Sequence, residues 1–140
     1  MNLLLRYGMG AGSIVRRKII IPPATATLTN FTIDVYLNSG NFDFGKAKTD
    51  GTDVYFTDLS DNLLKFERQE HSAALQMGVY HVKVPSISNT QNTEIYMYCG
   101  DQAGTDKQDK VNAWDSSYLC VIHLGVSLTD STSNGKNGTA

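Results

Sequence analysis

The sequence predicts an all-β protein, an antiparallel β-sandwich of jelly-roll-like form with a flexible N-terminal arm. Apolar and polar residues alternate in one short run after another, which is the period of a half-buried strand. Gly-, Asn- and Asp-rich turn signals separate these runs. The 140 residues match one domain, and 41% of them are hydrophobic, enough for a single core. Six or seven short strands with frequent turns favour an antiparallel sandwich over a parallel sheet.

The first expected strand, residues 16–21, is β-branched and ends at Pro22 and Pro23, where a strand must lose its ladder bonds. Residues 64–69 are also expected to be a strand, followed by a loop at 71–74. Helix formers are common there, but a polar block at 68–72 interrupts any helical stripe. Residues 118–124 are nearly all apolar, which indicates a central strand. The remaining strands are expected at 31–37, 53–57, 78–84 and 93–99, each from its alternation.

The chain divides into three regions by composition. Residues 1–14 form a glycine-rich N-terminal arm, and residues 15–125 form the β-sandwich domain. Residues 126–140 are rich in Ser, Thr, Asn and Gly and have too little apolar surface to fold alone. They are expected to be a polar linker, or the start of a further domain.

Composition and charge exclude several classes of function. The net charge of -2, with 19% charged residues, argues against a general nucleic-acid surface. The longest apolar runs are far shorter than the ~20 residues of a membrane helix, so no membrane insertion is expected. No secretory signal peptide is visible. Cys99 and Cys120 lie in apolar, strand-like runs, where buried free thiols are the first interpretation.

The motifs that carry chemistry in other proteins are incomplete in this chain. The glycines at 8, 10 and 12 follow an apolar run, but a dinucleotide site needs a helix next, and residues 14–21 are basic and β-branched. The histidines show no metal-ligand spacing. We therefore expect no cofactor and no metal. The clustered aspartates suit turns better than a calcium loop; they are Asp43, Asp50, Asp53, Asp58 and Asp61.

Two nearby glutamates are the residue type that forms the carboxylate pair of glycoside hydrolysis. Glu67 and Glu70 stand three positions apart, a spacing that on a regular strand places them on opposite faces. The sequence therefore predicts no catalytic residues, and we expect a protein that is not an enzyme.

Aromatic residues on the polar faces are the candidate ligand or interface residues. Tyr36, Tyr96 and Tyr98 occupy polar positions of their strands, and Trp114 lies in a loop. Such side chains stack on sugar rings and also contribute to subunit interfaces. Packing within the core or an interface remains open as the alternative.

The stretch Asn41-Phe-Asp-Phe-Gly-Lys-Ala-Lys-Thr-Asp-Gly-Thr-Asp-Val-Tyr-Phe-Thr-Asp58 resembles the signature of an uncharacterised domain of unknown function. Further blocks agree in order, namely Arg17-Lys-Ile19, Leu64-Lys-Phe-Glu67, Val79-Tyr-His-Val-Lys-Val-Pro85 and Ile95-Tyr-Met-Tyr-Cys-Gly100. That module precedes laminin-G or concanavalin-like lectin domains in bacterial surface proteins and phage tail proteins. The resemblance implies a β-sandwich with an extracellular or virion role and no established catalytic residues.

The residues near the C-terminus extend this resemblance. Val121-Ile-His-Leu-Gly125 and the polar segment after it resemble the opening of the lectin-like domain that normally follows the module.

These observations lead to an expected function as a non-enzymatic structural or attachment module of a bacteriophage virion. A tail fibre, head fibre or decoration protein would anchor or present a receptor- or glycan-binding domain after assembly in the host cytoplasm. The alternatives are a secreted bacterial adhesin or carbohydrate-binding module at the cell surface, and an accessory domain of a glycan-degrading enzyme.

The N-terminal arm supplies the expected assembly contact. It combines Leu3, Leu4, Leu5 and Tyr7 with flexible glycines, a composition too apolar for a solvated tail. Strand addition to a neighbour's sheet edge is the expected mode. The expected partners are other virion proteins or further copies of the chain in a homo-oligomer, and a cell-surface glycan.

Overall fold

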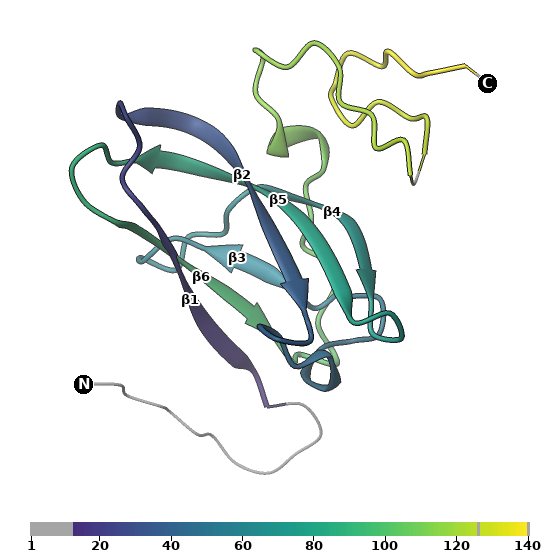
Figure 1. Cartoon of the computed structure of the whole chain (residues 1–140). Coiled ribbons are helices and arrows are strands. Elements are labelled where there is room, and N and C mark those ends of the chain that lie inside the picture. Colours follow the sequence, from purple (N-terminus) through teal and green to yellow (C-terminus); the bar gives the residue numbers. More distant parts are fainter. Residues whose placement is uncertain (1–12, 126, 140) are drawn as a thin grey trace.

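Six strands form two antiparallel three-stranded sheets in the computed structural model, which describes residues 13–125 and 127–139 (Figure 1). One sheet has the order β1-β6-β3 and the other β2-β5-β4. All four strand pairings are antiparallel, which confirms the predicted all-β sandwich. The strands are β1 (Val15–Ile21), β2 (Leu28–Asn38), β3 (Tyr55–Thr57), β4 (Phe66–Ser72), β5 (Met77–Ile87) and β6 (Thr93–Cys99).

The core lies between the two sheets and follows the predicted alternation. Phe56 of β3 contacts Phe66 of β4 and Tyr80 of β5 edge to face, with ring centroids 5.3 and 5.5 Å apart. All three side chains are fully buried. Aromatic pairs in this geometry add to the free energy of area burial, so they fasten one sheet to the other. The inward residues of β6 are Ile95, Met97 and Cys99.

The expected central strand at 118–124 is wrong. Residues 118–125 and 127–139 instead form an irregular C-terminal segment, in which Ile122 and Asp130 make an isolated bridge. Leu119 and Leu124 are 68% and 79% exposed. The segment lies against the side of a sheet through polar contacts and does not extend a sheet edge. An apolar run alone does not distinguish these two placements.

The polar C-terminal residues fold back around one carboxylate (Figure 1, yellow). Asp130 accepts hydrogen bonds from the backbone N–H groups of Val121, Thr132 and Lys136, at 2.8 to 3.0 Å. These donors favour the charged form and hold the pKa of Asp130 well below its usual range. The side chains of Asp130, Ser131 and Thr132 are buried. Residues 130–132 are therefore the buried part of this stretch, and most of its other residues are exposed.

Two short 3₁₀ helices complete the described elements. In η1 (Phe44–Lys46), the Asp43 side chain caps the first turn by accepting from the Gly45 N–H. η2 (Val111–Ala113) lies on the β2-β5-β4 sheet, where the Thr32 hydroxyl donates to the Ala113 carbonyl at 2.7 Å. This contact begins the path of the C-terminal segment over that sheet.

A bulge in β4 overturns the expectation that Glu67 and Glu70 face opposite sides. The pairing with β5 shifts between Arg68 and Glu70, so that Glu67 lies opposite His81 and Glu70 opposite Val79. Residues 79 and 81 share one face of β5. The extra residue of the bulge therefore brings both glutamates to the same face of the sheet.

The cysteine prediction is half right. Both thiols are free, but only Cys99 is buried, whereas Cys120 is exposed in the irregular C-terminal segment. The predicted arm contacts of Leu3, Leu4, Leu5 and Tyr7 lie outside the described residues. No helix among the described residues is long and apolar enough to cross a membrane.

Candidate functional site

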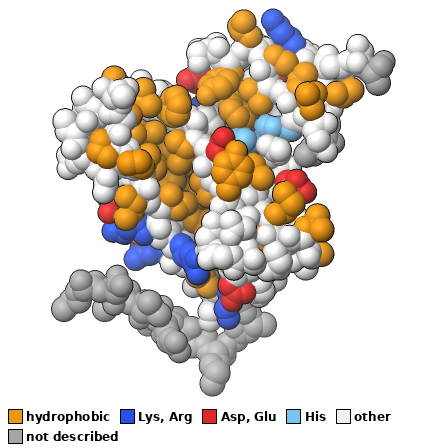
Figure 2. Space-filling view, viewed as in Figure 1, with side chains coloured by type: hydrophobic (Ala, Val, Ile, Leu, Met, Phe, Trp, Pro, Cys, Tyr) orange, Lys and Arg blue, Asp and Glu red, His pale blue; other side chains and the backbone are white. Residues whose placement is uncertain are grey.

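The outer face of the β1-β6-β3 sheet carries a row of aromatic and basic side chains. The register places Tyr98 of β6 between Arg16 of β1 and Tyr55 of β3, and Tyr96 opposite Lys18. These five residues alternate along their strands with the buried residues, so their side chains lie on the side of the sheet away from the core. In Figure 2, Lys and Arg side chains gather near β1, and hydrophobic side chains, a class that includes tyrosine, reach the surface.

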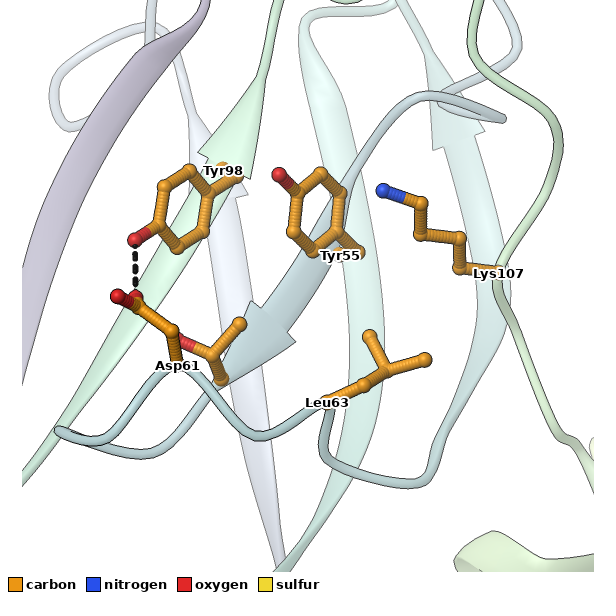
Figure 3. Close-up of a pocket in the computed structure, with 6 residues that line it drawn as sticks. Tyr55, Asp61, Leu63, Tyr98 and Lys107 are labelled. Atoms are coloured by element: carbon orange, nitrogen blue, oxygen red, sulfur yellow. Dashed lines mark hydrogen bonds between the residues drawn. The ribbon is translucent and has the colours of Figure 1, made fainter.

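Tyr55 and Tyr98 stack on each other across the two strands. Their ring planes differ by 2° and their centroids are 4.9 Å apart. Lys107, from the loop after β6, places its ammonium 3.6 Å from the centroid of Tyr55. Figure 3 shows the two rings side by side, with Lys107 pointing at Tyr55 from the side away from Tyr98. Tyr55 is thus held between a ring and a cation.

A turn between β3 and β4 brings a carboxylate to this aromatic pair. The Tyr98 hydroxyl donates to Asp61 Oδ1 at 2.7 Å (Figure 3). Asp61 adopts a left-handed conformation with φ of 61°, which aspartate tolerates better than most residues. Asp58 fixes the turn by accepting from the backbone N–H groups of Ser60 and Asn62. The carboxylate of Asp61 is therefore positioned before any ligand arrives.

These side chains surround a pocket of about 350 Å³ (Figure 3). The two tyrosines form its aromatic side, while the 46% exposed Leu63 adds an apolar wall. Burial raises the pKa of Tyr55, so its hydroxyl stays neutral and able to donate. The pocket combines apolar surface with a carboxylate and an ammonium group. Its lining residues are Tyr55, Thr57, Asp61, Leu63, Tyr98 and Lys107.

Tyr96 extends the aromatic surface toward β1. The Arg16 guanidinium carbon lies 4.4 Å from its ring centroid, and its ring meets that of Tyr98 edge to face at 6.5 Å. Lys18 beside it pairs with Glu94 at 2.8 Å. Tyr96 and Tyr98 are both half-buried, so the face is a partly accessible surface of rings bordered by cations.

The outer face of the other sheet is covered around a buried glutamate. Both carboxylate oxygens of Glu67 are engaged, because Oε1 accepts from Ser131 at 2.6 Å and Oε2 from Trp114 at 2.8 Å. His123 Nε2 lies 3.1 Å from Oε2 and Lys110 3.7 Å from Oε1. Four residues that follow β6 in the chain thus meet one side chain of β4, and two of them, His123 and Ser131, belong to the C-terminal segment. This arrangement anchors the segment to the sheet.

The electrostatic balance at Glu67 favours the charged carboxylate. Burial alone would raise its pKa, but the hydrogen bonds from Ser131, His123 and Trp114 outweigh burial and leave the pKa lowered. A lowered pKa suits an ionised anchor and not a proton donor. Both Glu67 oxygens already accept hydrogen bonds from Trp114 and Ser131, so this carboxylate serves the attachment of the C-terminal segment.

The structure brings together only two of the four aromatic residues predicted from sequence. Tyr96 and Tyr98 lie side by side on β6. Tyr36 is 61% exposed on β2 of the other sheet, where its hydroxyl donates to Asp34 at 3.3 Å. Trp114 lies beneath the C-terminal segment on Glu67 and acts as a packing residue there. Hence the candidate site is the surface of Tyr96 and Tyr98.

Of the six residues that line the pocket, sequence reasoning predicted Tyr98 as a site residue and missed the other five. Tyr55 alternates with the inward Val54 and Phe56, so the alternation itself could have placed it on the outer face. Asp61 was noted only among the aspartates that suit turns. Lys107 lies in a loop without periodicity, and no sequence signal pointed to it.

Most of the clustered aspartates accept hydrogen bonds within their own turns. Asp43 accepts from the Gly45 N–H, Asp50 from the Thr52 N–H, and Asp58 from the N–H groups of its loop. Asp53 is buried and accepts from the Lys48 N–H and from the Gly100 N–H at the end of β6. The turn interpretation is confirmed for Asp43, Asp50 and Asp58, whereas Asp53 joins its turn to a distant part of the chain. Within the described part of the chain, no three His, Cys, Asp or Glu side chains form a group that could hold a metal ion.

The fold and the exposed face define an all-β sandwich module with one open aromatic surface. The chain belongs to the family described as Domain of unknown function (DUF2341), whose model matches residues 50–119. This range contains every residue that lines the pocket. No curated protein and no solved structure gives a significant match to the chain.

Proposed function

We propose that this chain is a non-enzymatic attachment module that binds its target through the outer face of the β1-β6-β3 sheet, as a component of a bacteriophage virion. The target is a receptor or glycan at a bacterial surface. The observation that carries the proposal is the contrast between the two sheets. One is covered around Glu67 by the C-terminal segment, whereas the other keeps a pocket lined by Tyr55 and Tyr98.

The chemistry of the open face supports binding. Rings whose edges and faces are partly accessible bury large area at low entropic cost when a partner docks. Arg16 and Lys107 hold these rings in place through cation–π contacts of 4.4 and 3.6 Å. A face built in this way is preorganised, which reduces the cost of association.

Binding is tested with fluorescently labelled protein on intact bacterial cells. The double variant Tyr96→Ala/Tyr98→Ala is expected to lose binding, and the matched variant Tyr36→Ala, which removes an exposed tyrosine from the other sheet, is expected to retain it. Circular dichroism verifies that each variant is folded. Equal binding by both variants would refute the role of this face.

The virion setting is tested separately. Mass spectrometry of density-purified phage particles is expected to detect the chain in a fixed ratio to the major structural protein. Its recovery from the cell surface or the medium, with none in particles, would contradict the virion setting and support the secreted adhesin.

A further inference from the structure

The pocket between the tyrosine pair and the Asp61 turn presents three chemical groups to a ligand. Its aromatic side is formed by the stacked rings of Tyr55 and Tyr98. The Asp61 carboxylate and the Lys107 ammonium group lie on different sides of these rings, as Figure 3 shows. The volume of about 350 Å³ lies at the small end of the range for ligand sites. The pocket therefore suits one small ring at a time.

Two polar atoms in the pocket have unused hydrogen-bonding capacity. Asp61 Oδ1 accepts from Tyr98, whereas Oδ2 has no donor among the described residues. The Tyr55 hydroxyl likewise makes no hydrogen bond within residues 13–125 and 127–139. A carboxylate oxygen next to an aromatic surface is a suitable acceptor for ligand hydroxyl groups.

Two cations lie over the tyrosine rings of this face without a carboxylate partner among the described residues. Arg16 and Lys107 both lie over tyrosine rings, and neither forms an ion pair with a carboxylate in the described parts of the chain. Lys18, Lys65 and Arg68, by contrast, each pair with a carboxylate at 2.7 to 2.8 Å. A cation over a ring keeps its charge available to an anionic ligand.

We infer that this pocket binds an acidic sugar, a pyranose that carries a carboxylate. The apolar C–H face of the sugar packs on Leu63 and on the exposed edges of the two tyrosine rings, the hydroxyl groups donate to Asp61 Oδ2, and the sugar carboxylate pairs with Lys107. The inference rests on the proposed function, because it names the ligand of the same face. The partner chemistry is that of a uronic acid unit in a bacterial surface polysaccharide.

The test compares sugars that differ only in the carboxylate. The folded chain is titrated by nuclear magnetic resonance with methyl glucuronide and methyl glucoside, and with methyl galacturonide and methyl galactoside. At low salt the acidic member of a pair is expected to bind about tenfold more tightly, and added salt should reduce the difference.

Three variants assign the preference to residues. Lys107→Met keeps the length of the side chain but removes its charge, and is expected to abolish the preference for the acidic sugar. Asp61→Asn is expected to weaken the binding of acidic and neutral sugars alike. Lys46→Met makes the same charge change at an exposed position of η1 and is expected to change nothing. Thermal unfolding verifies that all three are as folded as the parent chain.

The possible outcomes separate this inference from the proposed function. Equal affinity for acidic and neutral sugars, or a preference that survives Lys107→Met, would overturn the inference. If no sugar binds while cells still bind protein through Tyr96 and Tyr98, the inference is refuted and the attachment function stands. If cell binding is also independent of these tyrosines, both are refuted.

Discussion

The imidazole ring of His123 lies parallel to that of His81, with 4.8 Å between their centroids and 7° between their planes. His81 belongs to β5, where its ring nitrogens contact Asp34 at 2.6 Å and Gln69 at 2.8 Å. His123 belongs to the C-terminal segment and contacts Glu67. The stacked pair therefore joins the segment to all three strands of the β2-β5-β4 sheet.

Replacing Glu67 with alanine should release the C-terminal segment and destabilise the fold. The change leaves Trp114, Ser131 and His123 without their acceptor, at a cost of about 3 kcal/mol for a buried charged partner. Urea unfolding measures the loss, and limited proteolysis reports cleavage within residues 115–139. Glu70→Ala, on the same face, should change stability by less than about 0.5 kcal/mol. Equal losses would show that Glu67 is not the anchor.

Low pH should weaken the same contacts between Glu67 and the C-terminal segment. The lowered pKa of Glu67 means that its carboxylate stabilises the fold above the ordinary value of 4.5, and that this contribution is lost as the pH falls through the lower folded-state value. Trp114 is the only tryptophan in the chain and donates to Glu67. Its fluorescence should change in the acid range.

The variant Glu67→Gln is the control for this titration. It keeps the shape of the side chain but cannot change charge, so its tryptophan signal should lack that acid transition. Asp130 and His123 remain in place in both proteins. An identical fluorescence titration in the variant would assign the transition to another group.

The two thiols should differ sharply in reactivity. Burial raises the pKa of Cys99 to about 11, and its side chain is 2% exposed, so little thiolate is present or accessible at mildly alkaline pH. Cys120 is exposed. Brief alkylation of the native protein should label Cys120 alone, and alkylation in denaturant should label both, as read by mass spectrometry. Rapid native labelling of Cys99 would contradict the described core.

A methyl group at Gly51 should be costly for two separable reasons. Its φ of +68° disfavours a side chain, and a Cβ there would come within 2.5 Å of both His71 and Tyr80. We expect Gly51→Ala to cost about 2 to 4 kcal/mol. Gly135→Ala has a similar φ of +64° with nothing within 4 Å, and should cost only about 1 kcal/mol.

Urea unfolding of both glycine variants separates strain from crowding. The backbone term is common to the two positions, so the difference between them measures the close approach of His71 and Tyr80. Equal losses would show that these side chains move aside without cost.

Alternation predicted the strands well because the sandwich buries one side of each strand. Residues 93–99 were predicted to the residue, since Ile95, Met97 and Cys99 face the core. The bulge in β4 was not predicted, because an inserted residue interrupts the alternation of apolar and polar positions along the strand. Residues 118–124 were wrongly predicted to be a strand. An apolar run does not reveal whether a neighbouring strand is available to pair with it.

The site was predicted only where it lies on a strand. Tyr96 and Tyr98 follow from the pattern of β6. The contact of Lys107 with Tyr55 depends on the path of a loop after β6, which no local sequence pattern specifies. Trp114 was placed among surface aromatics because the sequence does not reveal that the segment folds back onto Glu67.

The anchoring of the C-terminal segment has a mechanical consequence. In Figure 1 the chain enters β1 at one end of the molecule, and its C-terminal end lies at the other. Tension between these ends loads the seven paired residues of β1 in shear, whereas it can detach the C-terminal segment from Glu67 one contact after another. Freed residues 110–139 would extend to roughly 100 Å. The sandwich would thus stay intact while a tether lengthens, and this release would limit the force on the β1-β6-β3 sheet.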